Sequence, residues 1–358
     1  MAERCGALEE VVMRQPLADF WRGKRVLLTG HTGFKGAWLA LLLERLGAEV
    51  TGFALAPEAG PSAFAALRPG LASRIGDLRD AAAVQAAVQA ARPEIVLHLA
   101  AQALVGRGYR DPEGTFASNV SGTINLMQAL RGAGVRTALM ITSDKVYRND
   151  NQGRAFREDD ALGGHDPYSA SKAACEIAVA SWRASFGAEI GAMATARAGN
   201  VIGGGDFGAE RLIPDLVRAR LAGEALIIRR PDATRPFQHV LDVLRGYLLH
   251  AEALWHGAAP PALNFGPRDA EISVRRVLEL YEAAAKAPVQ WQAAAAPPME
   301  EAQRLALDSG LAMQSLGWAP RHDAASAIAA TAHWYEAWRG GADGRALALT
   351  EIEDALSP

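Results

Sequence analysis

Cysteine and lysine are both scarce in this chain of 358 residues. The two cysteines, Cys5 and Cys175, lie far apart and offer neither a disulfide framework nor the paired spacing of a zinc site. We therefore expect two free thiols in a reducing cytoplasm and no bound metal. Lysine occurs at only five positions, so a lysine within a motif is more informative here than in an average sequence.

The chain also lacks a strong excess of charge and any long apolar run. Its formal net charge is −3, which leaves no basic surface of the kind that nucleic acid binding requires. No stretch approaches the roughly 18 consecutive apolar residues of a membrane span, and acidic residues interrupt the N-terminal segment, unlike a secretory signal. With 50% hydrophobic and 22% charged residues, the composition indicates a globular, cytoplasmic protein with no nucleic acid or membrane partner.

Alternating apolar segments predict an α/β fold. Strands are expected at residues 24–29, 49–55, 74–78, 94–100 and 138–143. Helices are expected at residues 36–46, 81–91 and 111–132. Strands that are apolar along their whole length and alternate with helices are typical of a parallel sheet covered on both faces. The sequence therefore predicts a Rossmann-like, doubly wound parallel sheet.

The composition of the chain changes after residue 198. A glycine-rich, loop-like segment follows at 199–206, and prolines recur between residues 231 and 267. These features predict a smaller C-terminal α/β lobe. The expected division is a leader at 1–19, a Rossmann domain at 20–198 and about 236–262, a substrate lobe at 199–235 and 263–340, and a tail at 341–358.

A glycine motif lies between the first expected strand and the first expected helix. Gly30, Gly33 and Gly36 form a GxxGxxG pattern there. Glycines allow a tight turn and a close backbone approach, and the start of the helix presents free N–H groups to a pyrophosphate. The motif alone is a weak signal, but its position on the first strand-to-helix turn favours dinucleotide binding over a purely structural turn.

Tyr168 and Lys172 open another expected helix, four residues apart and so on one face. A lysine ammonium at this spacing favours the phenolate form of the tyrosine, which can then act as a general base. The alternative is a surface tyrosine beside a solvated lysine. The upstream glycine motif and the order of the strands favour the catalytic interpretation.

Ser143, Asp144 and Lys145 follow the fifth expected strand. In open α/β sheets, ligands lie beyond the carboxyl ends of the strands, so these side chains are expected to face the same site as Tyr168. A hydroxyl, an acid and a base would then meet there. An ordinary Asp–Lys turn is the alternative, and the presence of Tyr168 and Lys172 argues against it.

Longer strings spread over residues 20–320 resemble those of the bacterial CDP-glucose 4,6-dehydratases, a branch of the extended short-chain dehydrogenases. The strings are TGHTGFKG, HLAAQALV, TSDKVY, LGGHDPYSASKAACE, ARAGNVIGGGDF, RLIPDLVRA and TRPFQHV. The resemblance implies NAD as cofactor, bound by the Rossmann domain, and a nucleotide sugar such as CDP-glucose, bound by the smaller lobe. It also implies a homodimer packed through helices near 113–132 and 168–186.

The same resemblance implies roles for individual residues. Those assigned to the cofactor are Gly30, Thr32, Gly33, Phe34, Gly36, Asp77, Leu78, Ala100, Gln102, Tyr168 and Lys172. Those assigned to the phosphates of the nucleotide sugar are Asn200, Arg211 and Arg235, with His239 and Asp242 as weaker candidates. Guanidinium groups suit an anionic diphosphate.

The catalytic residues implied are Ser143, Asp144, Lys145, Tyr168 and Lys172. In the implied mechanism, Tyr168 takes the proton of the sugar 4-hydroxyl while Ser143 hydrogen-bonds the same oxygen. Lys145 then removes a proton from carbon 5, and Asp144 protonates the departing 6-hydroxyl. This mechanism requires a neutral amine at Lys145 and a protonated carboxyl at Asp144 near neutral pH.

The chain departs from the family pattern at three places. Residues 53–55 follow the second strand and contain no carboxylate for the ribose hydroxyls of NAD, so the preference for NAD over NADP rests on the resemblance. Gly106 and Gly108 flank Arg107 where bulkier polar residues are expected. The later HEA motif is replaced by EEA at 300–302. The last two departures leave the identity of the sugar open.

The sequence does not fix the nucleobase or the sugar, so a 4,6-dehydratase of another nucleotide sugar is one alternative. Two other functions also compete with the dehydratase prediction. A nucleotide-sugar 4-epimerase would share the glycine motif, Ser143, Tyr168 and Lys172, but it needs no acid and base for elimination, so Asp144 and Lys145 argue against it. A non-catalytic dinucleotide-binding protein would need only the fold. The complete set of Ser143, Tyr168 and Lys172 argues against that function.

Overall fold

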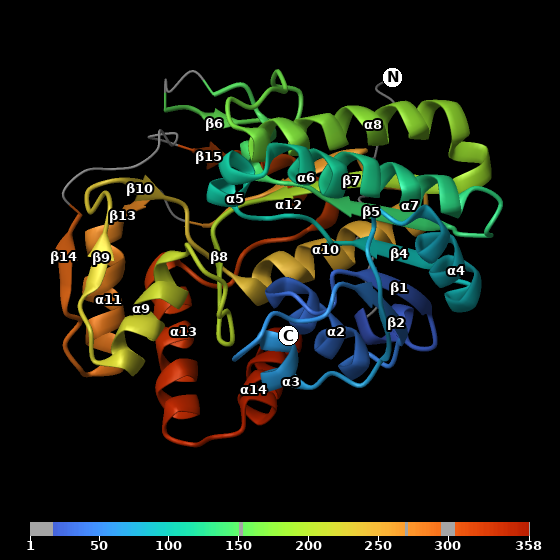
Figure 1. Cartoon of the computed structure of the whole chain (residues 1–358). Helices are drawn as coiled ribbons and strands as arrows, with labels where there is room; N and C mark the ends of the chain where they lie inside the picture. Colours follow the sequence, from blue (N-terminus) through green and yellow to red (C-terminus); the bar gives the residue numbers. More distant parts are fainter. Residues whose placement is uncertain (1–16, 150–152, 269–270, 295–304, 358) are drawn as a thin grey trace, which may run out of the picture.

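A seven-stranded parallel sheet forms the centre of the computed structural model, which describes residues 17–149, 153–268, 271–294 and 305–357 (Figure 1). The strands follow the order β12-β7-β5-β4-β1-β2-β3, and every pairing is parallel. They are β1 (Arg25–Thr29), β2 (Glu49–Ala54), β3 (Ala72–Ile75), β4 (Ile95–His98), β5 (Thr137–Ile141), β7 (Ala192–Ala198) and β12 (Ala262–Phe265). The predicted Rossmann-like fold class is confirmed.

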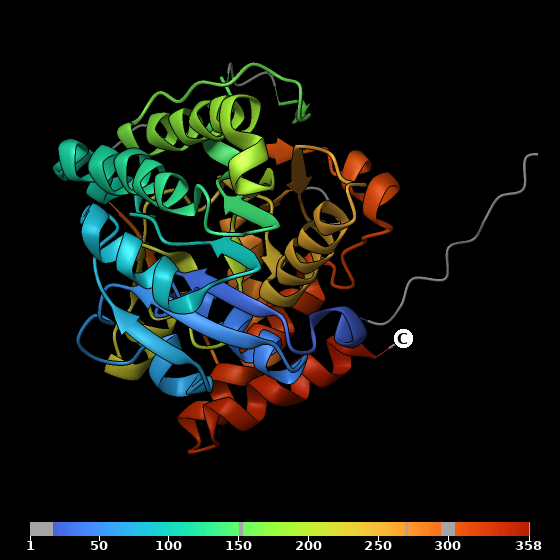
Figure 2. The same cartoon turned by 90° about the vertical axis from the view of Figure 1, so that its right-hand side faces the viewer.

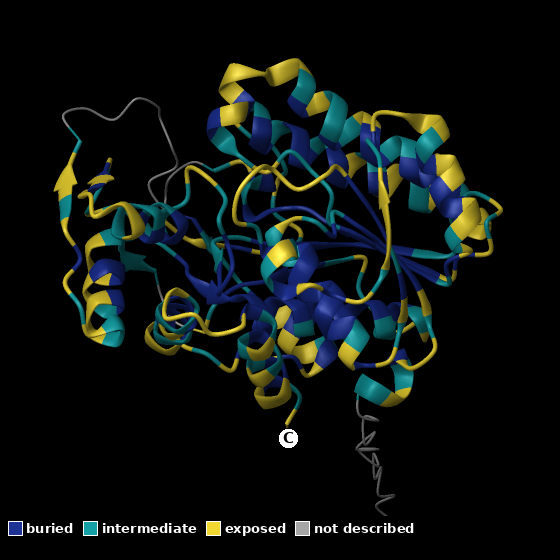
Figure 3. Ribbon diagram, turned by 60° about the horizontal axis from the view of Figure 1, so that its bottom comes forward, coloured by how far each residue is buried: buried dark blue, intermediate teal, exposed yellow. Residues whose placement is uncertain are grey.

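Helices cover both faces of this sheet (Figures 1 and 2). One face packs against α2 (Phe34–Arg45) and α10 (Val240–Trp255), the other against α4 (Ala81–Ala91), α7 (Gly122–Leu130) and α8 (Pro167–Ile190). Successive strand residues point to opposite faces, so Val26 and Leu28 join one core while Leu27 joins the other. The central strands β4 and β5 are accordingly buried along their whole length, the edge strand β3 is exposed, and the outer helices alternate buried and exposed residues (Figure 3).

The helix predicted at 111–132 is confirmed as one helical run over residues 112–130, with a π-helical turn inside it that the sequence did not predict. The structure has α5 (Val105–Arg110), α6 (Pro112–Phe116), a π-helical turn (Ala117–Ser121) and then α7. The predicted start is close, because the Asp111 side chain accepts a hydrogen bond from the N–H of Gly114 at 2.9 Å. Within the π turn, Asn119 accepts from the N–H of Gln102 at 2.7 Å and donates to its carbonyl at 3.0 Å. A bulge of this kind is common near functional sites.

A smaller group of elements lies to one side of the sheet (Figure 1). Its strands pair as β9 (Leu226–Ile228) with β14 (Trp291–Ala293), and β10 (Thr234–Arg235) with β13 (Ile272–Ser273). Its helices are α9 (Leu212–Ala222) and α11 (Val274–Ala285), with α13 (Ala324–Arg339) packed against α11. The remaining elements are α1 (Leu17–Trp21), α3 (Ala63–Leu67), the 3-10 turn Asp144–Val146, β6 (Ala155–Phe156), β8 (Val201–Ile202), β11 (Gln238–His239), β15 (Ala306–Leu307), α12 (Gly310–Leu316) and α14 (Gly344–Leu356).

Two segments differ from the division expected from the sequence. Strand β12 begins at residue 262, where the Rossmann domain was expected to end, and continues in the main sheet to residue 265. The expected tail contains helix α14, which packs against α3 and is joined to α2 by ion pairs of Arg345 with Glu44 and of Arg45 with Glu353. The division into domains stays a prediction.

Some predictions fall outside the part of the chain that the structure describes. These concern Cys5, most of the expected leader, and the EEA segment at 300–302. Cys175 is a buried free thiol. Among the described residues, no helix is both long and apolar enough to span a membrane.

Candidate active site

The glycine turn between β1 and α2 leaves space against its own backbone. Gly30 has φ +78°, and a β-carbon there would lie 2.7 Å from the amide nitrogen of Ala100. At Gly36, a β-carbon would lie 2.0 Å from the carbonyl oxygen of Gly30. Gly33 caps α2 without a side-chain hydrogen bond, so the N–H groups of the first turn remain open to a ligand. These residues fit the pyrophosphate of a dinucleotide.

We expect Gly36→Ala to lower the stability of the folded chain by about 1–3 kcal/mol, because an added methyl group would overlap backbone atoms. Dinucleotide binding should weaken with it. Gly33→Ala is the matched control, because a β-carbon there would lie at an ordinary 3.4 Å from the same Gly30 oxygen. Thermal unfolding of the two variants tests the difference. Equal unfolding midpoints would contradict the close approach at residue 36.

The other end of the turn leads to the predicted adenosine site. The carboxylate of Asp77 is held by Arg79, with contacts of 2.9 and 2.6 Å to Nε and Nη2, and this hydrogen bonding lowers the pKa of Asp77. Thr32 donates to the carbonyl of Leu55 at 2.9 Å. The Leu55 side chain itself is exposed, at the place where a ribose-binding carboxylate was expected. Leu55 and Asp77 both line the cavity, so an apolar residue and a carboxylate lie in this part of its wall.

Ser143, Asp144 and Lys145 form a compact group immediately after β5. The Ser143 hydroxyl donates to Asp144 Oδ1 at 2.9 Å and accepts from the N–H of Lys145 at 3.2 Å. Lys145 Nζ lies 3.3 Å from the same Asp144 oxygen. Asp144 is buried, and its Oδ2 has no hydrogen-bond partner among the described residues. Oδ2 lies against Gly199, where a β-carbon would approach to 1.8 Å.

The ion pair sets the charge of Lys145. Burial lowers the pKa of Lys145, but attraction by Asp144 and Tyr168 outweighs burial, so its pKa lies above the ordinary lysine value. This shift is opposite to the one that a free general base requires. Lys145 is therefore an ammonium as long as Asp144 is its carboxylate partner.

Helix α8 supplies Tyr168 and Lys172. The helix begins after Asp166, whose side chain accepts from the N–H of Ser169 at 2.9 Å. Tyr168 lies in the cavity wall, and Lys172 is buried with its ammonium donating to the carbonyl of Ile141 at 3.1 Å. Gly108 packs against Tyr168, since a β-carbon there would lie 3.1 Å from the Tyr168 nitrogen. A glycine at 108 thus leaves space beside the candidate base.

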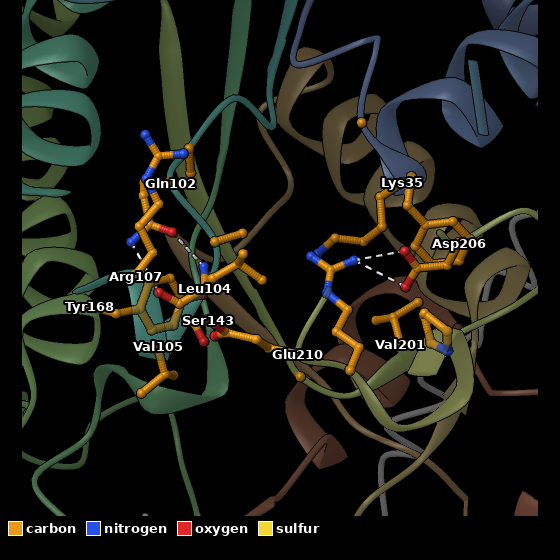
Figure 4. Close-up of a pocket in the computed structure, with 18 of the residues that line it drawn as sticks. Lys35, Gln102, Leu104, Val105, Arg107, Ser143, Tyr168, Val201, Asp206 and Glu210 are labelled. Atoms are coloured by element: carbon orange, nitrogen blue, oxygen red, sulfur yellow. Dashed lines mark hydrogen bonds and ion pairs between the residues drawn. The ribbon is translucent and has the colours of Figure 1, made fainter. Parts of the chain in front are cut away.

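The predicted substrate residues line the same cavity as Tyr168. Arg211 contacts both carboxylate oxygens of Asp206 at 3.0 Å, and Arg235 donates to the carbonyl of Thr234 at 2.8 Å. Asn200 has φ +46°, and its Nδ2 has no partner among the described residues. The close-up shows Tyr168 and Gln102 on one wall, with Lys35 and Asp206 on the other (Figure 4).

His239 and Asp242 are not part of this cavity. His239 caps α10 by accepting from the N–H of Leu241, and Asp242 accepts from the N–H groups of Arg321 and His322, both at 3.0 Å. Both residues therefore hold the junction around α10 together, and the structure gives them no contact with a ligand site. Their weaker candidacy for substrate binding is not supported.

A single cavity of about 630 Å³ brings the other predicted site residues together. Lys172 is the one member of that remaining set that does not line it. Sequence reasoning missed several lining residues, which are Lys35, Thr142, Asp206, Glu210, Arg229 and Arg230. Lys35 had a usable signal, because it is one of only five lysines and lies within the glycine motif. Burial, with the nearby cations of Lys172 and Arg211, lowers its pKa to about 7.

The structure also explains the glycine at 106. A β-carbon there would lie 2.2 Å from a carboxylate oxygen of Glu210, which in turn pairs with Arg110 at 2.8 Å. Glu210 precedes α9 and Arg110 ends α5, so this ion pair joins two walls of the cavity. Glycine at 106 and 108 therefore accommodates Glu210 on one side and Tyr168 on the other.

Comparison with known proteins extends these observations. Residues 26–266 match the model of a family described as the NAD dependent epimerase/dehydratase family. The chain is 39% identical over 355 residues to the CDP-glucose 4,6-dehydratase of Salmonella typhimurium, covering 95% of this chain and 98% of that protein. The match is nearly end to end on both sides.

Two solved structures share the fold. One is the dTDP-glucose 4,6-dehydratase DesIV from Streptomyces venezuelae with NAD bound, at 27% identity and a TM-score of 0.76, covering 88% of this chain and 98% of that one. The other is the UDP-glucose 4-epimerase of Thermus thermophilus in complex with NAD, at 27% identity and a TM-score of 0.77, covering 89% and 100%. The fold is thus shared by enzymes of both reaction types.

Proposed function

Because the chain belongs to the NAD dependent epimerase/dehydratase family, we propose that it is a nucleotide-sugar 4,6-dehydratase and that CDP-glucose is its substrate. One observation carries the proposal. The Asp144–Lys145 ion pair lines the same cavity as Ser143 and Tyr168, so groups for oxidation and for elimination face one substrate. The 39% identity to a CDP-glucose 4,6-dehydratase supports the choice of nucleotide.

The glycine turn fits NAD because the N–H groups at the start of α2 are open and because Gly36 lies close to the backbone of Gly30. When bound, NAD supplies the redox chemistry by accepting a hydride from carbon 4 of the sugar and returning it to carbon 6. The chain itself must bind both ligands and move the protons. Tyr168 takes the proton of the 4-hydroxyl, and Ser143 hydrogen-bonds the same oxygen.

The elimination falls to Asp144 and Lys145. A proton that passes from Lys145 Nζ to Asp144 across 3.3 Å converts the ion pair into a neutral amine and a neutral carboxylic acid. Two neutral groups are less costly than two charges in a cavity from which substrate excludes water. This transfer reconciles the raised pKa of Lys145 with its role as a base.

The neutral pair is then ready for elimination. Lys145 takes the proton of carbon 5, which the ketone at carbon 4 has made acidic, and Asp144 gives its proton to the 6-hydroxyl, which leaves as water. The pair returns to its ionic form in this step. Lys145 later protonates carbon 5 again, the proton that Tyr168 took from the 4-hydroxyl passes back to the Lys145 amine, and the product is a 4-keto-6-deoxy sugar.

Arg211, Arg235 and Asn200 are proposed to hold the diphosphate. Two guanidinium groups in the lining of the cavity, and an Asn200 amide nitrogen that has no partner within the described part of the chain, support this role. For Arg211, the ligand would share the guanidinium with Asp206. The roles of these residues, like those of the cofactor and catalytic residues, are proposals.

We also propose a homodimer formed through α6 to α8, in the cytoplasm. Phe116 on α6 and Ile177 on α8 are 39% and 62% exposed. Large apolar side chains exposed on the predicted dimer helices support an interface there. Both lie within the segments 113–132 and 168–186.

We expect NAD to support many turnovers at a concentration far below that of the product, because the hydride leaves and returns within one catalytic cycle. The assay uses enzyme stripped of cofactor, a panel of nucleoside diphosphate hexoses, and mass spectrometry to detect the loss of one water. CDP-glucose should give the highest kcat/KM. Activity restored by NADP alone, or reduced cofactor formed one for one with product, would contradict the proposal.

A further inference from the structure

A buried ion pair lies next to the candidate active site but outside its cavity. Glu176 on α8 and Arg197 on β7 are 2.7 Å apart, and their side chains are 3% and 5% exposed. Burying such a pair costs desolvation energy, and well-packed apolar residues of similar size would serve stability as well or better. A buried pair therefore invites a search for a role that depends on its geometry.

One contact of Glu176 leads to the carboxyl end of β5. Tyr168, Lys172 and Glu176 are spaced four residues apart and share one face of α8. Lys172 donates to the carbonyl of Ile141 at 3.1 Å, and Glu176 accepts a short hydrogen bond from the hydroxyl of Thr142. Lys172 and Glu176, one turn apart on α8, thus bind the consecutive residues Ile141 and Thr142.

The next three residues, 143–145, are called the acid–base segment here. Thr142 attaches the segment at its start to Glu176. On the far side, Tyr147 accepts from Arg197 at 2.7 Å and donates to Asn264 at 2.6 Å. The two halves of one ion pair therefore hold both flanks of the acid–base segment.

We propose that Glu176 and Arg197 are positioning residues that hold the acid–base segment at a working distance from Tyr168. The proposal rests on the proposed function, since it assigns the pair to the same reaction. A displacement of about 1 Å in a catalytic group can cost on the order of 10²-fold in rate. Two anchored flanks on one rigid pair would prevent such a displacement.

The test must leave the ion pair in place. Removing Glu176 would strand a buried arginine, and the variant could fail to fold for that reason alone. Two threonines offer a better comparison, because the hydroxyls of Thr142 and Thr195 each donate to one oxygen of Glu176, the latter at 2.7 Å. Both are buried, but only Thr142 adjoins the acid–base segment.

We expect Thr142→Val to lower kcat by about 10- to 100-fold with little change in KM, since it frees one flank of the acid–base segment. Thr195→Val removes an equivalent hydrogen bond from β7 and should leave kcat within about threefold of the parent. The two variants should unfold at similar temperatures. Thr142 also lines the cavity, so Thr142→Ser, which keeps the hydroxyl, should restore most of kcat.

A second measurement does not depend on activity. Crystal structures of the two valine variants should show Ser143 displaced relative to Tyr168 only in Thr142→Val. Equal kcat in both variants of an active parent, or an undisplaced Ser143 in Thr142→Val, would overturn the positioning role. If the parent forms no 4-keto product from any nucleotide sugar, the proposed function fails, and the displacement of Ser143 alone decides the positioning role.

Discussion

Replacement of Tyr168 by phenylalanine is expected to slow oxidation at carbon 4 of the sugar by about 10²–10⁴-fold, the usual contribution of a general base. The substitution keeps the ring and removes the only group proposed to take the proton of the 4-hydroxyl. Tyr168 is 8% exposed, and its backbone packs against Gly108, so the shape of the site should survive. Single-turnover mixing with substrate measures the step through the absorbance of reduced nicotinamide.

Tyr281→Phe is the matched control for this experiment. Tyr281 is fully buried on α11, lies outside the cavity, and its hydroxyl has no hydrogen-bond partner among the described residues. We expect that variant to oxidise substrate at the parental rate. Near-normal oxidation by Tyr168→Phe would mean that another residue is the base.

Replacement of Lys145 by methionine is expected to separate the two halves of the reaction. Oxidation needs Tyr168 and Ser143, so hydride transfer from carbon 4 should persist, whereas product release should fall by about 10²–10⁴-fold without a base for carbon 5. In heavy water, the parent enzyme should place deuterium on carbon 5 of the product. Rapid mixing and mass spectrometry of the released sugar measure the two steps separately.

Lys24→Met controls for the loss of a lysine as such, because Lys24 lies over the rings of Phe20 and Trp255 and outside the cavity. If Lys145 only pairs with a carboxylate or a phosphate, its methionine variant would bind substrate weakly but turn over well at saturation. If Lys145→Met keeps most of its kcat, Lys145 is not the base for carbon 5. The 4-epimerase function would then be tested next.

Sequence reasoning reached the sheet because its signals are local. The apolar strands and the GxxGxxG turn after β1 each depend on neighbouring residues. The π turn inside the helix predicted at 111–132 was not predicted, and within it Asn119 hydrogen-bonds the backbone of Gln102, 17 residues earlier in the chain. The spacing of apolar residues that predicts a helix does not reveal such a partner.

The site was predictable in its members and less so in its electrostatics. Motifs named the residues that meet in the cavity, but the pKa of Lys145 depends on its distance to Asp144 and on burial, which spacing in the sequence cannot supply. Glu176 ends the string LGGHDPYSASKAACE, but the resemblance assigned no role to it. Its importance follows from contacts with residues on β5 and β7, far away in the chain.

The placement of β12 has a consequence for how this protein can diverge. Strands β7 and β12 are neighbours, with Ala198 paired to Phe265, although the whole of 199–261 lies between them. The part of that excursion before α10, residues 199–239, lies outside the main sheet, so it can be lengthened or exchanged without altering the order of the strands. It carries Asn200, Arg211 and Arg235, whereas Tyr168 and the acid–base segment precede it. Selection can therefore change which nucleotide sugar is held while the proton-transfer chemistry is inherited intact.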